Sequence, residues 1–258
     1  MDNPMLWKIP LILIVSASLE IAMTAPNPNG KAQSEERQRY DRDNKTRDAV
    51  PMPLGWGPPT FKGAGHVVSL LEIAAILVSL CPSALRAVHL DWIADSPFLQ
   101  QGSKVAITSP FIFGFLLSVF GAYIRLTCYR YLGRQFTFSL TLQKDHKLIT
   151  GGPYAIVRHP SYTGLFAFYF GSLVSQMGPG SFWFEAGLWN LAPAKGVGVV
   201  AWGVMWAIGA FYVAYRLWVG YALFERVNRE DTVLMDEFKD QWVTWSKNTP
   251  YRLIPYVY

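Results

Sequence analysis

Five long apolar runs alternate with polar segments along this chain of 258 residues. A bilayer core of roughly 30 Å requires about 20 apolar residues in helical form, and these runs are close to that length. The pattern therefore predicts an all-α fold, an integral membrane bundle of about five transmembrane helices. The predicted spans are Leu6–Ala25, His66–Val88, Val105–Leu132, Pro160–Met177 and Gly196–Phe224.

The first run has two interpretations, a retained helix or a cleaved signal peptide. Its end, Ala22-Met23-Thr24-Ala25, has the small residues of a cleavage site. The residues before it are only weakly basic, however, and Pro26 would follow the cut. We therefore expect the first helix to be retained.

The polar segments differ in character. Residues 26–65 are rich in Pro, Gly, Asn and charges of both signs, which predicts a linker at the membrane surface. Pro82 should kink or end the second span. The chain after Phe224 is polar and has apolar residues at helical spacing, which predicts a surface helix.

Lys and Arg residues are distributed asymmetrically among the connecting segments. The 26–65 segment holds seven, and the segments after the third and fifth spans are also basic. The 89–104 and 178–195 loops hold one each, Lys104 and Lys195. Because basic loops remain in the cytoplasm, residues 133–159 and the tail after Phe224 should share the cytoplasmic side.

Composition excludes several classes of function. Hydrophobic residues make up 51% of the chain and the basic residues lie between apolar runs, so the net charge of +5 indicates membrane flanks rather than nucleic-acid binding. Cys81 and Cys128 lie in apolar runs without metal-binding spacing, and we expect both to be reduced. The four histidines do not have metal-ligand spacing, and P-loop, GxSxG and GxGxxG motifs are absent from the sequence. We therefore expect neither a metal nor a nucleotide-hydrolysis site.

The most informative stretch is residues 151–164, GGPYAIVRHPSYTG. Turn signals at Gly151-Gly152-Pro153 and Arg158-His159-Pro160 bracket it, and Pro160 predicts the start of a helix. The unpaired N–H groups of such a start could bind a carboxylate or phosphate. The alternative is that both turns only return the chain to the membrane, with Arg158 and His159 as interfacial anchors.

A second polar cluster follows the fifth span. Arg226 and Glu230 are four residues apart and should share a helical face, while Asp231 turns to the side. The simpler interpretation is an exposed ion pair of small energetic value. A functional role is favoured because charges so close to the hydrocarbon are costly.

The residues 132–164 and 226–255 together resemble the isoprenylcysteine carboxyl methyltransferase family, integral membrane enzymes that use S-adenosylmethionine. The GPY and RHPSY elements, the R-x-x-x-E-D element and the Trp and Pro residues near the end occur in the family's order. The similarity covers about Arg130–Pro255, half of the chain. The hydropathy pattern divides the first part of the chain into a first transmembrane helix (1–25), a cytoplasmic linker (26–65) and two transmembrane helices (66–132), and the resemblance implies that residues 133–258 are the catalytic region.

The resemblance implies roles for individual residues. Arg226 would hold the substrate carboxylate, and Glu230 would contact the cofactor beside it. Asp231 stands where the family usually has a second Glu, which keeps the charge but shortens its reach, so Glu230 is the stronger candidate. The implied cofactor-binding residues are His146, Lys147, Leu148, Ile149, Tyr154, His159, Pro160, Ser161, Tyr162 and Glu230.

The implied activity is methyl esterification of the C-terminal carboxylate of isoprenylated cysteine proteins or peptides in the endoplasmic reticulum membrane, with a cytoplasmic cofactor pocket formed by an interhelical loop and the C-terminal helix. A carboxylate is already ionised at neutral pH, so its methylation requires positioning and exclusion of water rather than a general base. The alternatives are a phospholipid N-methyltransferase, a carboxyl methyltransferase of another lipophilic acid, and a non-catalytic protein that binds prenylated partners.

Overall fold

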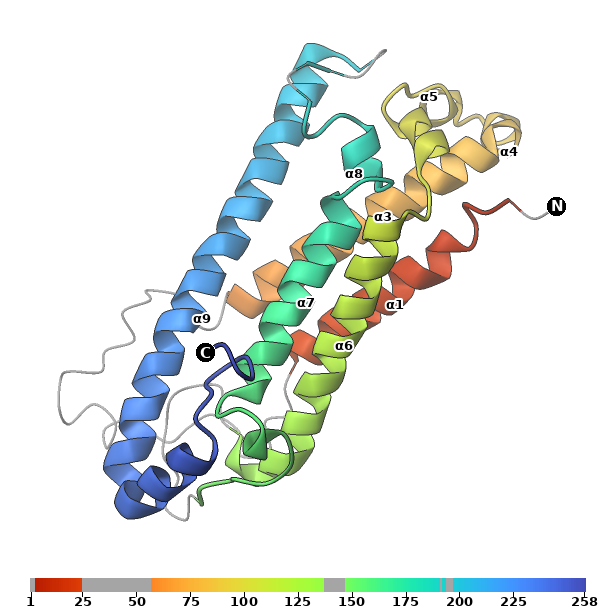
Figure 1. Cartoon of the computed structure of the whole chain (residues 1–258). Coiled ribbons are helices and arrows are strands. Elements are labelled where there is room, and N and C mark those ends of the chain that lie inside the picture. Colours follow the sequence, from red (N-terminus) through yellow and green to blue (C-terminus); the bar gives the residue numbers. More distant parts are fainter. Residues whose placement is uncertain (1–2, 25–56, 137–146, 191, 194–196) are drawn as a thin grey trace. The chain divides into compact units, whose positions relative to one another are not determined.

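The computed structural model describes residues 3–24, 57–136, 147–190, 192–193 and 197–258. All regular secondary structure in these residues is helical, which confirms the predicted all-α class. Figure 1 shows the elements in chain order. They are α1 (Lys8–Met23), α3 (Gly57–Leu80), α4 (Pro82–Ala87), α5 (Asp91–Ala94), η1 (Leu99–Lys104), α6 (Ser109–Leu132), η2 (Gly133–Gln135), η3 (Gly152–Ala155), α7 (Pro160–Met177), α8 (Phe182–Glu185) and α9 (Val199–Asn248).

Three helices in the described residues are long and apolar enough to cross a membrane. They are Pro59–Leu80, Ser109–Leu132 and Val199–Asn248. The other two predicted spans, Leu6–Ala25 and Pro160–Met177, form the shorter helices α1 and α7, which have 16 and 18 residues and are not among these three. These lengths and compositions support an integral membrane protein of several helices.

Prolines mark several helix boundaries as the sequence predicts. The helix α3 ends at Leu80, just before Pro82 begins α4, and α7 begins at Pro160. Proline is compatible with a helix's first turn because its missing N–H would have no partner there. The same rule explains a difference from the prediction: α3 begins at Gly57, nine residues before the predicted start at His66, with two prolines in its first turn.

The helix α9 continues from the predicted fifth span through the polar tail to Asn248. Its helical conformation is interrupted at Lys239, where φ is 44° and ψ is −115°. A positive φ is uncommon for a residue with a Cβ atom. The interruption changes the direction of the chain before Trp242 and Trp245.

The chain packs into two compact units, and the unit boundaries fall within the long helices. The first unit comprises Met1–Glu20, Phe61–Val119 and Ala167–Leu217, and the second comprises Ile21–Thr60, Phe120–Phe166 and Trp218–Tyr258. Long helices such as α6 and α9 therefore contribute residues to both units.

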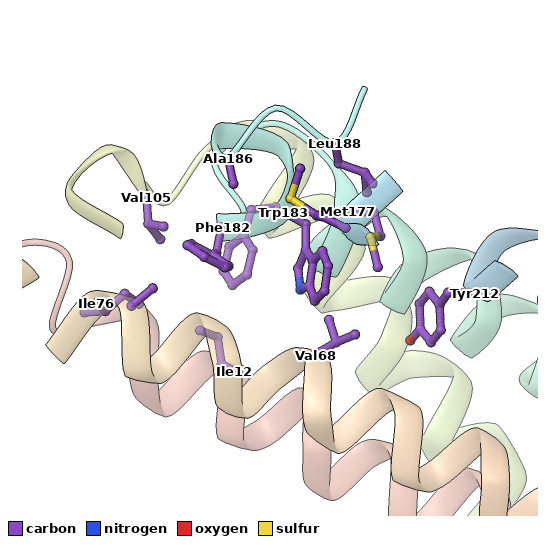
Figure 2. Packing of buried hydrophobic residues seen from close by; sticks show 13 residues of the cluster. Ile12, Val68, Ile76, Val105, Met177, Phe182, Trp183, Ala186, Leu188 and Tyr212 are labelled. Carbon is purple, nitrogen blue, oxygen red and sulfur yellow. The ribbon is translucent and has the colours of Figure 1, made fainter. Parts of the chain in front are cut away.

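The core of the first unit joins α8 to the long helices around it. Figure 2 shows Phe182 and Trp183 pointing toward the helices that carry Ile76, Ile12 and Val68. Phe182 is wholly buried, and Trp183 nearly so. Small residues let α6 and α7 approach closely: a Cβ atom at Gly114 would lie 2.6 Å from the carbonyl oxygen of Gly171.

Two buried cations stabilise the first unit. The Lys8 ammonium lies 2.7 Å from the Glu72 carboxylate and donates to the carbonyl of Gly180 at 2.7 Å. Arg216 donates to the carbonyl of Tyr169 at 2.8 Å, to Ser172 at 2.9 Å, and to Gln176 and Tyr212. Because buried charge is costly in an apolar medium, these contacts define how α1, α3, α7 and α9 pack within this unit.

The Lys8–Glu72 pair yields a stability prediction. Glu72→Gln leaves the buried Lys8 without its counter-charge and should reduce the free energy of unfolding by about 3–5 kcal/mol. The measurement is the thermal unfolding midpoint of the purified protein in detergent. The double variant Lys8→Met, Glu72→Leu removes both charges and should recover most of the loss; equal destabilisation in the double variant would contradict this account.

Candidate functional site

The candidate site lies in the second unit, where residues 147–164 meet the polar part of α9 and the end of the chain. Its central residue is Asp231, a buried residue of α9. Arg158 makes a bidentate contact with this carboxylate, Nη2 to Oδ2 at 3.0 Å and Nε to Oδ1 at 3.3 Å. His159 Nε2 lies 2.8 Å from Oδ1, and Arg252 Nε lies 3.1 Å from Oδ2. One carboxylate therefore joins the central loop, α9 and the terminal segment.

Main-chain hydrogen bonds attach the end of the chain to the same loop. The N–H groups of Arg158 and His159 donate to the carbonyls of Tyr251 and Arg252, both at 2.9 Å. The Thr163 hydroxyl donates to the carbonyl of Leu253 at 2.6 Å. These bonds place the terminal segment alongside the start of α7. The N–H groups of Tyr162 and Thr163, which the sequence predicted to be unpaired, donate to the carbonyl of His159 at 3.0 and 3.2 Å, so the structure does not support an anion site on these two groups.

The Arg158 side chain also binds main-chain carbonyls just before the terminal segment. Besides the Asp231 contact, its Nη1 donates to the carbonyls of Thr249 and Pro250, at 3.1 and 2.8 Å. Its guanidinium lies 5.7 Å from the ring centroid of Trp242. Arg158 is thus a buried structural cation, which rules out the interpretation that it acts only as an interfacial anchor.

Glu230, beside Asp231, has a different environment. It is half-buried and accepts a hydrogen bond from the Tyr162 hydroxyl at 2.8 Å. Arg226, also half-buried, lies close enough to the Tyr162 hydroxyl to interact with it electrostatically. The two predicted halves of the site, the start of α7 and the Arg226–Glu230 turn of α9, therefore meet at Tyr162.

An aromatic cluster lies on the loop side of the site. Tyr154, Cys128 and Trp245 are buried together, with Leu148 and Ile149 packed against them. The indole N–H of Trp245 donates to the carbonyl of Tyr154 at 3.1 Å. Burial is the main cause that raises the pKa of Tyr154 well above its ordinary value, and the nearby Glu230 carboxylate adds to it. A tyrosine hydroxyl is protonated at neutral pH even without this shift.

The remaining predicted residues have less prominent positions. Lys147 is exposed, and its main-chain N–H donates to the Gln135 side chain at 2.7 Å. Ser161 Oγ accepts from Arg125 at 2.8 Å, and Pro160 is buried at the start of α7. His146 lies outside the described residues. The sequence did not indicate Arg252, Thr163 or Arg125, since a single Arg or Thr has no local pattern that points to a site.

The set of side chains is suited to binding a polar ligand rather than to proton abstraction. Among the described residues no group of three or more His, Cys, Asp or Glu could hold a metal ion. The His159 ring is used by Asp231 and the Tyr154 hydroxyl remains protonated. The Glu230 carboxylate and the Arg226 guanidinium lie beside Tyr162, and their contact with a ligand stays a prediction.

Comparison with known proteins agrees with the sequence motifs. Residues 114–184 match the model of the isoprenylcysteine carboxyl methyltransferase (ICMT) family. Protein-S-isoprenylcysteine O-methyltransferase B of Arabidopsis thaliana is 26% identical over 188 residues, 72% of this chain and 79% of that protein. Protein-S-isoprenylcysteine O-methyltransferase of Schizosaccharomyces pombe is 26% identical over 152 residues, 54% of this chain and 52% of that protein. These matches confirm the predicted resemblance to a family of methyltransferase enzymes.

The Asp231 contacts predict that a substitution at this position loosens the terminal segment. Asp231→Asn removes the counter-charge of Arg158 and Arg252 and should reduce stability by about 3 kcal/mol. It should also increase amide hydrogen exchange at residues 158–159, whose N–H groups bond to the terminal segment. Asp236→Asn, an exposed change on the same helix, is the matched control and should leave both measurements unchanged. Unaltered exchange in the Asp231 variant would contradict the proposed attachment.

Proposed function

We propose that this protein catalyses S-adenosylmethionine-dependent methyl esterification of the C-terminal carboxylate of isoprenylated cysteine. The observation that carries the proposal is the meeting of Tyr162, Glu230 and Arg226, residues from two distant parts of the family-like region. Tyr162 OH lies 2.8 Å from Glu230 Oε2, although 68 residues separate them in the sequence. The names of the Arabidopsis and fission-yeast relatives support the same reaction class.

The chemistry of the site fits this cofactor. Glu230 offers a carboxylate for the amino or ribose hydroxyl groups, while Leu148, Ile149 and Tyr154 offer an apolar and aromatic surface for an adenine ring. The indole nitrogen of Trp242 is buried and has no hydrogen-bond partner among the described residues, so it can donate to a ligand. When bound, S-adenosylmethionine supplies an electrophilic methyl group on a sulfonium sulfur.

The protein's part in the reaction is positioning. Arg226 would hold the substrate carboxylate, which is ionised at neutral pH and needs no base. Glu230, fixed by the Tyr162 hydroxyl, would hold the cofactor beside it. The Asp231 contacts keep α9 and the loop in one arrangement, and close, oriented reactants account for a large share of such a rate enhancement.

The membrane location follows from the same proposal. A substrate with an isoprenyl chain is delivered by the bilayer, so a membrane enzyme can receive the chain laterally while its polar end reaches Arg226. The positions of Lys and Arg favour a cytoplasmic site, and we propose the endoplasmic reticulum membrane as its location.

The proposal is tested by supplying the purified protein with methyl-labelled S-adenosylmethionine and one of two acceptors. A farnesylated cysteine with a free carboxylate should yield a base-labile methyl ester, whereas phosphatidylethanolamine should remain unlabelled. Label on the lipid amine would contradict the proposal and indicate a phospholipid N-methyltransferase. Cofactor binding without methylation of either acceptor would also contradict it, and would favour another lipophilic acid or a non-catalytic binding role.

The assignment of Arg226 predicts a separation of binding from turnover. Arg226→Ala removes the cation opposite the substrate carboxylate and should reduce ester formation about 100-fold or more, with little change in S-adenosylmethionine affinity. Arg226→Lys retains the charge without the planar fork and should be intermediate. Rates from single-turnover assays and affinities from calorimetry check this; an unchanged rate would remove Arg226 from the site.

The assignment of Glu230 predicts that its substitution weakens cofactor binding. Glu230→Gln keeps the shape but removes the charge, and it should weaken S-adenosylmethionine binding about tenfold, by roughly 1.4 kcal/mol. Tyr162→Phe removes only the hydroxyl that fixes Glu230 and is expected to have a smaller effect in the same direction. A normal cofactor affinity for Glu230→Gln, measured by calorimetry, would show that this carboxylate does not contact the cofactor.

A further inference from the structure

The last six residues form a closed turn with a defined conformation. In this terminal turn, residues 253–258, the N–H groups of Leu253 and Ile254 donate to the carbonyl of Tyr258 at 2.8 and 3.0 Å. The N–H groups of Val257 and Tyr258 donate back to the carbonyl of Ile254 at 3.2 and 3.0 Å. Tyr256 has a φ of 65°, a conformation that is unfavourable for a residue with a Cβ atom.

The terminal turn presents apolar side chains outward. Tyr256 is 87% exposed, Val257 is 74% exposed and Ile254 is 52% exposed. The Leu253 side chain of the same turn is buried. A cluster of exposed apolar side chains on a structured turn is unfavourable in water and marks an interaction surface.

Contacts within the second unit place this turn at a defined level along α9. The Tyr258 ring stacks on Phe224, with centroids 5.4 Å apart and an interplanar angle of 24°. Phe224 ends the apolar run of α9, and Glu225 and Arg226 follow it directly. The terminal turn therefore lies where this spanning helix changes from apolar to polar, the level at which a membrane helix meets the lipid headgroups.

The neighbouring surface has the composition of a membrane interface. Trp218 and Tyr221 on α9 are exposed, like Tyr256, and aromatic residues are enriched where a protein leaves the hydrocarbon. Arg252 lies just before the turn and is half-buried. This combination of exposed apolar and aromatic groups is typical of the level at which a membrane protein meets the lipid headgroups.

We propose that the terminal turn is a membrane-interface anchor that inserts Ile254, Tyr256 and Val257 among the lipid headgroups around Phe224. The residues just before these side chains belong to the site: Arg252 contacts Asp231, and the Leu253 carbonyl accepts from Thr163. Lipid contact at the turn thereby holds the terminal segment against the start of α7. The proposal requires that α9 spans the membrane, but it does not depend on which reaction the site catalyses.

The test measures the depth of a spin label in the full-length protein, reconstituted in nanodiscs of phosphatidylcholine and phosphatidylserine. Val257→Cys is labelled in a Cys81→Ser background, because Cys81 is exposed and Cys128 is buried. Collisions with oxygen, which dissolves in lipid, are compared with collisions with a water-soluble nickel chelate. Lys247→Cys, an exposed position on the polar helix, is the matched control.

The expected result is an oxygen-to-nickel collision ratio several-fold higher at position 257 than at position 247. Equal ratios would show that the turn lies in water and would overturn the proposal. Shielding of position 257 from both reagents would also overturn it, because a protein surface, such as a second copy of the chain, would then cover the turn.

A second variant separates lipid contact from folding of the turn. Glycine accepts a φ of 65° without strain, so Tyr256→Gly should preserve the backbone of the turn while removing the exposed ring, together with its contact to the Tyr251 ring at a centroid distance of 5.3 Å. The expected result is unchanged amide hydrogen exchange at Val257 and Tyr258, whose N–H groups close the turn, and a lower oxygen-to-nickel ratio at position 257. An unchanged ratio would show that the Tyr256 ring does not insert.

Discussion

The site depends on a buried carboxylate, Asp231, shared by groups from separate parts of the chain. Arg158 and His159 reach it from the loop before α7, and Arg252 reaches it from the terminal segment. A buried charge is tolerated only when its partners neutralise it and satisfy its hydrogen-bonding capacity. Each partner is therefore constrained by the others, and the loop, α9 and the terminal segment take one common arrangement.

This constraint explains why two neighbouring acids have different roles. Asp231 has the shorter side chain and is buried among cations, whereas the longer Glu230 is half-buried and accepts from Tyr162. The sequence analysis prefers Glu230 to Asp231 as a ligand-binding residue because of its longer reach, and in the structure the two carboxylates have different partners. An acid whose oxygens are occupied by protein cations has little capacity left for a ligand, so Asp231 stabilises the arrangement of the site, and a ligand contact by Glu230 stays a prediction.

Local sequence signals predict the helix ends that prolines mark. Pro160 marks the start of α7 and Pro82 follows the end of α3, as predicted. The start of α3 at Gly57 lies outside the predicted span because a Pro-rich composition favours a linker, although proline is compatible with a first helical turn. The role of Arg252 could not be predicted, since its partner Asp231 lies 21 positions earlier and neither residue belongs to a repeating pattern.

Buried charges have a similar physical role in both units. In the first unit Lys8 is paired with Glu72, while Arg216 is surrounded by neutral oxygens from Tyr169, Ser172, Gln176 and Tyr212. Between apolar helices the hydrophobic effect offers little specificity, because lipid tails are as apolar as the side chains that they would replace. Directional contacts to buried cations therefore specify which helix faces meet. In the second unit the same type of contact is made around Asp231, directly beside Glu230 and Tyr162, so the interactions that specify the packing also position the candidate ligand-binding groups.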